Sequence, residues 1–145
     1  MAITTAMCTS FKQELLGGVH DLDTHTIKLA LIKNSMSGTY GAATTNYSDV
    51  TGNSDESSGT NYTAGGQNLD SAAIAVSSTT AHVDFADEVF SNVTTSAAGC
   101  IIYNSSASNK AICVIDFGGT VSATAGDLTI EFPAAGASTA VIRIA

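Results

Sequence analysis

The chain has 145 residues, of which 44% are hydrophobic and only 12% are charged, and its formal net charge is −8. A chain of this length and hydrophobicity can bury a core of its own, unlike a disordered protein. Nucleic-acid binding depends on clustered cations, whereas the five cations here are scattered along the sequence, so we expect neither nucleic acid nor an anionic membrane as a partner. These cations are Lys12, Lys28, Lys33, Lys110 and Arg143.

Residues 1–9 carry no charged side chain and no signal-peptide pattern, and we expect them to form a flexible arm that orders on a neighbouring subunit. A short helix is expected next. Ser10 and Gln13 match a capping box, and Gly17-Gly18 ends the helix. A helix of about two turns is stable only when it packs on something else. Phe11 on its apolar face is therefore a candidate contact residue.

Residues 26–32 alternate between two faces and predict a strand. Residues 33–67 then form a long polar segment rich in Ser, Thr, Asn and Gly. Loops of this length are uncommon and usually functional. Tyrosine rings tend to anchor a loop to a core or to a partner. We expect an ordered loop that contacts another subunit through Tyr40, Tyr47 and Tyr62.

Three further strands are expected in close succession, at residues 69–76, 81–86 and 89–93. In the first, Ile74 and Val76 should point inward. In the second, Val83 and Phe85 should point inward, because they alternate with a polar face that contains His82.

The strongest hairpin signal is formed by residues 99–104 and 110–117, which flank a serine-rich turn. If Asn104 pairs with Asn109, Cys100 lies opposite Cys113 and Ile101 lies opposite Ile112. The two thiols could then be neighbours, either as core packing, which we favour, or as a cross-strand disulfide. Together with Cys8 they show no metal-binding spacing, and a reducing cytoplasm would keep all three reduced.

Gly118-Gly119 predicts a turn, Leu128–Phe132 an alternating strand that Pro133 ends, and residues 140–145 a last strand. Several short strands with regular turn signals indicate an all-β fold. We expect a single domain over residues 1–145, an antiparallel β-sandwich or barrel with one short N-terminal helix.

No catalytic pattern is recognisable, so we expect a protein that is not an enzyme and holds no cofactor or metal. His20, His25 and His82 lie beside no nucleophile motif. The glycine pairs are followed by no Gly-Lys-Ser/Thr and so form no phosphate loop. A weak cation site near Asp49–Glu56 or Asp84–Glu88 is an alternative to simple solvation, although neither has the ligand order of a calcium loop.

Several segments resemble small virion structural proteins of tailed bacteriophages, including phages of cyanobacteria. They are residues 1–15, Ile27–Leu31, Asn61–Gly66, Ile101–Asn104, Asp116–Gly118 and Ile142–Ala145. The resemblance implies a cement (decoration) protein that binds the outside of an icosahedral capsid, assembled in the host cytoplasm and located in the virion. Its partners would be the major capsid protein and copies of itself, with a trimer favoured because it suits three-fold shell sites.

Two other readings stay open. The same resemblance is compatible with a tail or fibre-associated structural protein. A carbohydrate-binding β-sandwich is a further alternative, in which the three loop tyrosines would stack on sugar rings, although the chain has no Trp.

Overall fold

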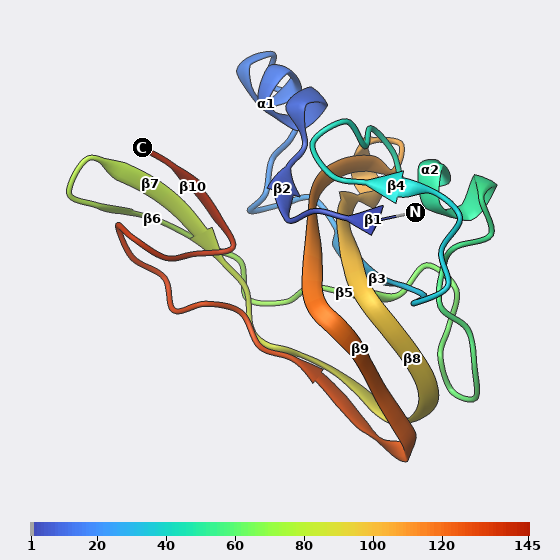
Figure 1. The fold of residues 1–145 in the computed structure, drawn as a ribbon. Helices are drawn as coiled ribbons and strands as arrows, with labels where there is room; N and C mark the ends of the chain where they lie inside the picture. The colour runs from blue at the N-terminus through green and yellow to red at the C-terminus, as the bar shows by residue number, and fades with distance from the viewer. Residues whose placement is uncertain (1) are drawn as a thin grey trace.

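The structure, a computed structural model, describes residues 2–145 (Figure 1). In that range it has ten strands, two short α-helices and one 3-10 turn. The expected all-β, mainly antiparallel fold with a short N-terminal helix is confirmed. A second helix, α2 (Ser48–Gly52), lies in the segment expected to be a loop.

The main sheet has five strands in the order β2, β9, β8, β3, β5, and all its neighbours pair antiparallel. Their bounds are Ala6–Met7 for β2, Ile27–Ile32 for β3, Gln67–Asn68 for β5, Glu88–Asn104 for β8 and Lys110–Ile130 for β9. As predicted, β3 is a strand, and five of its six residues are buried. Its apolar residues on both faces agree with its position inside the sheet, between β8 and β5.

Strands β8 and β9 form the predicted hairpin, but the predicted register is wrong. Asn104 pairs with Lys110, and Cys100 pairs with Ile115 instead of Cys113. The turn is longer than expected: it contains the 3-10 turn η1 (Ser105–Ala107) and takes in Asn109. A further irregularity between Ile102 and Tyr103 adds one more residue to the offset.

The predicted turn at Gly118-Gly119 is also wrong, because β9 runs through both glycines. Ala97 pairs with Val121 and Gly99 pairs with Asp116, so three extra residues of β9 bulge at this point. Gly118 has a φ of 75°, which a glycine adopts without strain. Further along, β8 and β9 bend sharply together and lead toward a second sheet (Figure 1).

The second sheet has three antiparallel strands in the order β10, β7, β6. Their bounds are Ala73–Ser77 for β6, Thr80–Asp84 for β7 and Ile142–Ile144 for β10. Val83 and Phe85 are buried, as predicted.

Two predictions for the second sheet are wrong. Ile74 and Val76 are 57% and 70% exposed, because β6 is the outer strand and little covers it. His82 is buried rather than solvent-facing, and its Nε2 lies 2.9 Å from Ser77 Oγ.

Residues 2–7, expected to be part of a flexible arm, are paired instead. Strand β1 (Ala2–Ile3) lies parallel to β4 (Thr39–Tyr40), and β2 lies against β9. Helix α1 (Thr9–Leu16) follows and ends at Gly17, as predicted. The expected capping box is absent: Cys8 occupies the N-cap position, and the buried Ser10 hydroxyl has no partner.

Candidate functional site

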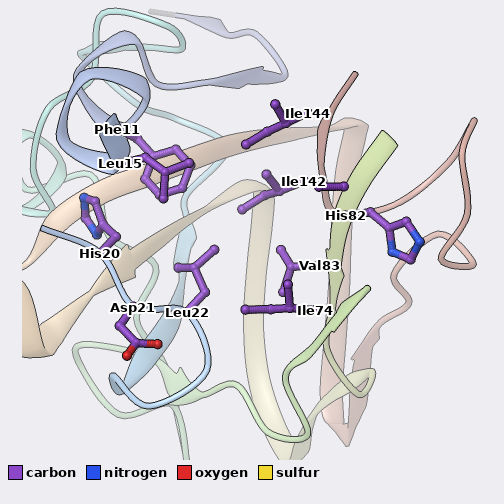
Figure 2. A pocket seen from close by; sticks show the side chains of 11 residues that line it. Phe11, Leu15, His20, Asp21, Leu22, Ile74, His82, Val83, Ile142 and Ile144 are labelled. Carbon is purple, nitrogen blue, oxygen red and sulfur yellow. The ribbon is translucent and has the colours of Figure 1, made fainter. Parts of the chain in front are cut away.

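An open apolar cleft lies between helix α1 and the three-stranded sheet, and Figure 2 shows it from close by. Its volume is about 380 Å³. One wall comes from α1 and the loop after it, and the other from all three strands of the second sheet. Its lining includes Phe11, Leu15, Leu22, Ile74, Val83 and Ile142.

The strand register explains why one face of the second sheet is apolar. Ile142 pairs with Val83, which pairs with Ile74 on its other side. Directly opposed residues point to the same side of a sheet, so these three side chains form a row. Figure 2 shows the row facing Phe11 and Leu22, whereas His82 points away from the cleft.

Large apolar side chains in and beside the cleft are exposed to solvent. Leu16 is 92% exposed at the end of α1, and Ile144 is 50% exposed on β10. A neighbouring hollow of about 400 Å³ shares Leu15 and Ile144 with the cleft and is bordered by Lys12 and Arg143. Clustered apolar exposure of this kind is typical of interaction surfaces.

A polar chain borders the cleft beside Phe11. His20 is buried, its Nε2 lies 3.0 Å from Glu14 Oε2, and its Nδ1 lies 3.0 Å from the Asn104 amide nitrogen. Since Nε2 faces a carboxylate, we assign the proton to it and Nδ1 as the acceptor from Asn104. Burial lowers the pKa of His20, although the contact with Glu14 raises it. Both ring nitrogens are engaged, so His20 offers no free base to the cleft.

The three cysteines are free thiols and all are buried. Burial raises the pKa of Cys8 to about 12 and raises those of Cys100 and Cys113. Because the thiolate is the reactive form, none of them has the properties of a nucleophile at neutral pH. The absence of a disulfide agrees with the preference for core packing.

The predicted contact tyrosines are fixed inside their own chain. Tyr40 is 1% exposed, and its hydroxyl donates to Asp55 at 2.6 Å. The hydroxyls of Tyr47 and Tyr62 both donate to Glu56, at 2.5 and 2.9 Å. The tyrosines therefore anchor residues 33–67 to this chain's own core.

Phe11 lies apart from the tyrosines, at the bottom of the cleft, and is fully buried. Phe11 and Tyr40 are both buried, so they could contact another subunit only if the packing around them were disrupted. The Tyr47 ring stacks on the Tyr103 ring with centroids 4.5 Å apart, so Tyr103 covers one of the two faces on which a sugar ring could stack.

In the acidic grouping Asp49–Glu56, the carboxylates are engaged by donors of the chain itself. Asp55 accepts hydrogen bonds from Ser37 and Gly38 as well as Tyr40, and lies 3.3 Å from Lys33 Nζ. Asp49 accepts from Thr45. Within residues 2–145 the structure has no group of three or more His, Cys, Asp or Glu that could hold a metal ion. The same residues include no helix long and apolar enough to span a membrane.

Sequence reasoning missed the cleft, although part of the signal was present. Ile142 and Ile144 alternate with Arg143 and so predict an apolar strand face. This strand face lies opposite helix α1, which is more than 120 residues earlier in the chain. Periodicity carries no information about such a long-range contact.

Comparison of the chain with protein-family models, with curated proteins and with solved structures gave no match. The resemblance to phage virion proteins therefore stays an expectation from the residues alone.

Proposed function

We propose that this protein is a structural subunit that works through contact with other protein subunits and not through catalysis. The observation that carries the proposal is the exposed apolar surface in and around the cleft. Ile74 and Ile144 line the cleft, Leu16 lines the neighbouring hollow, and Val76 lies on β6 beside the cleft residue Ala81. All four exposed side chains are at least half exposed. Leaving such side chains in water is costly, at about 25 cal/mol for each Å² of apolar surface. A partner that covers them recovers this free energy.

The engaged state of several titratable groups supports a non-catalytic role, the unpartnered Nδ1 of the buried His82 being an exception. His20 uses both ring nitrogens, Asp55 and Glu56 are occupied by donors of the chain, and the thiols have raised pKa values. These groups therefore serve packing and internal hydrogen bonding.

The sequence resemblance supports a finer version of the proposal. In it, the chain is a cement protein on the outside of a tailed-phage capsid, with the major capsid protein and further copies of itself as partners. Many weak contacts of this kind add up, because each additional contact of a bound oligomer is intramolecular. A tail-associated role is the alternative.

The test is co-sedimentation of the purified protein with capsids and, separately, with isolated tails from the same phage. We expect saturable binding to capsids that weakens at least tenfold in Leu16→Lys, because a charge would be buried in the contact beside the cleft. The matched control is Thr51→Lys on the exposed side of α2, which should bind like wild type. Binding to tails alone would favour the alternative, and binding to neither would contradict both.

A second candidate is the binding of a small apolar ligand, because about 380 Å³ lies within the usual size of ligand pockets. An apolar fluorescent probe tests it. Saturable binding that is lost in Val83→Asp but kept in Thr51→Lys would support this function.

A further inference from the structure

Strand β6 has a free edge. In the part of the chain that the structure describes, β7 is the only strand paired with it. Four successive residues, from Ala73 to Val76, are exposed, so neither face of this stretch is covered. A strand paired on one side only presents a row of N–H and C=O groups that can bind another strand.

This edge carries none of the features that usually prevent strand addition. Residues 73–77 contain no charged side chain, no proline and no register irregularity. The other edge strands, β10, β5 and β2, have two or three residues each, whereas β6 has five. Strand β6 is thus longer than the end strands β10, β5 and β2, and its side chains are mainly apolar.

The side-chain pattern of β6 is close to symmetric about its centre. Ile74 and Val76, both β-branched, flank Ala75. In an antiparallel pairing of two identical strands centred on Ala75, each Ile74 lies opposite Val76 of the second copy, and the two alanines lie opposite each other. Such β-branched cross-strand pairs are favourable.

We propose that β6 pairs antiparallel with β6 of a second copy of this chain, centred on Ala75, to form one continuous six-stranded sheet. The inference rests on the proposed function in that it names one of the subunits with which the protein makes contact.

The proposed pair has a two-fold axis perpendicular to the sheet. Ile74 and Val76 then stay on the same side of the sheet in both copies, since a slip by one residue would reverse the faces. The two apolar clefts open on that common side. The contact is isologous and gives a dimer, which differs from the trimer expected from the resemblance.

Charge also favours this edge as the meeting point. Two copies, each with a net charge of −8, repel one another over most of their surfaces. Strand β6 contributes no charge to the contact. We therefore expect the dimer to survive, or to strengthen, when salt screens the remaining repulsion.

Cysteine cross-linking of the full chain tests the register. In the proposed pair, the two thiols introduced by Ala75→Cys lie directly opposite, within the Cα separation that a disulfide allows. The two thiols introduced by Ala73→Cys are offset by four residues along the paired strands, because each Ala73 lies opposite Ser77 of the second copy. This offset separates them by about 13 Å. The three native thiols are buried and give a low background. We expect a covalent dimer in high yield under mild oxidation from the first variant and at least tenfold slower from the second.

Molar mass in solution tests the contact without a cross-link. The wild type should have twice the chain mass, and Ala75→Lys should be monomeric, because it places like charges opposite each other. Val121→Lys, at an exposed apolar position of β9, is the matched control and should remain dimeric. Circular dichroism should show unchanged strand content in all variants, since each substituted side chain is exposed.

A monomeric wild type, a trimer unaffected by Ala75→Lys, or equal cross-linking of the two cysteine variants would overturn the inference. Each of these results leaves capsid binding to be measured separately. A β6 dimer that binds neither capsids nor tails would instead overturn the virion role and leave the self-pairing standing.

Discussion

The hydroxyl of Tyr40 donates a 2.6 Å hydrogen bond to the fully buried carboxylate of Asp55. The backbone N–H groups of Ser37 and Gly38 donate to the same carboxylate, and Lys33 lies 3.3 Å from it. The buried carboxylate of Asp55 thus interacts with donors from three places in the polar segment 33–67: Lys33, the Ser37-Gly38 backbone and Tyr40. This explains how a segment with few aliphatic side chains is ordered.

Removing the Tyr40 hydroxyl should lower the free energy of unfolding by about 1.5–3 kcal/mol, the usual range for a hydrogen bond to a charged group. Tyr40→Phe makes this change. Tyr103→Phe is the matched control, because the Tyr103 hydroxyl donates at 2.6 Å to a neutral acceptor, the Gly65 carbonyl. Urea denaturation should show a loss of only about 0.5–1.5 kcal/mol for the control. Equal losses would mean that the charge of Asp55 adds nothing.

Asp55 should also make the protein sensitive to acid. Burial alone would raise the pKa of its carboxyl, but the bonds from Tyr40, Ser37, Gly38 and Lys33 hold the pKa well below the ordinary 3.8. The unfolded chain therefore takes up this proton at higher pH than the folded protein does. The stabilisation is complete above about pH 5 and is lost as the pH falls through 3.8 toward the folded pKa.

Denaturation midpoints of wild type and Asp55→Asn between pH 7 and pH 3 check this prediction. We expect Asp55→Asn to be less stable at pH 7 and to lose less stability than wild type below pH 4. Asp23→Asn, at an exposed position, should follow the wild-type curve. Parallel curves for wild type and Asp55→Asn would contradict the assignment.

Sequence periodicity predicted the strands whose apolar pattern matches the way they are covered. It identified β3, the two strands of the hairpin, and the buried faces of β7 and of the end of β9, where Leu128 and Ile130 are buried. β7 and the end of β9 alternate, whereas β3 and the hairpin strands near the turn are apolar on both faces, and each is covered accordingly.

The features that periodicity did not predict depend on long-range packing and on turn geometry. Ile74 alternates as a buried residue would, but β6 lies at an edge, and an edge position cannot be read from alternation. The hairpin register depended on the turn between Asn104 and Lys110 and on a bulge, neither of which has a pattern of apolar residues. The cleft could not be predicted, because its two walls are joined only by tertiary packing.

His20 should produce a second step in stability at milder pH. Its pKa is below the ordinary 6.5, because burial outweighs the effect of Glu14, and His25 and Lys110 lower it further. As the pH falls through 6.5, the unfolded chain binds this proton and the folded protein does not. The free energy of unfolding therefore decreases between about pH 7 and the folded pKa.

We expect wild type to be less stable at pH 5.5 than at pH 7.5, and His20→Gln to show a smaller difference. The comparison uses urea denaturation in buffers of equal ionic strength. The ring of His20 can also be followed by NMR during a pH titration. A ring that takes up its proton above pH 6.5 in the folded protein would contradict the prediction.

Gly66 allows β5 to approach β3, and an alanine in its place should be strongly destabilising. Its φ is 73°, and an added Cβ would overlap the carbonyl oxygen of Leu29. We expect Gly66→Ala to lower the free energy of unfolding by clearly more than about 1 kcal/mol, since Ala is strained at positive φ and the backbone of β3 must shift. Gly52→Ala is the matched control, because Gly52 lies at the end of α2 with open space around it. Its stability should be unchanged or higher by up to about 1 kcal/mol. If urea denaturation gave the two variants equal midpoints, the close packing of β5 on β3 would be wrong.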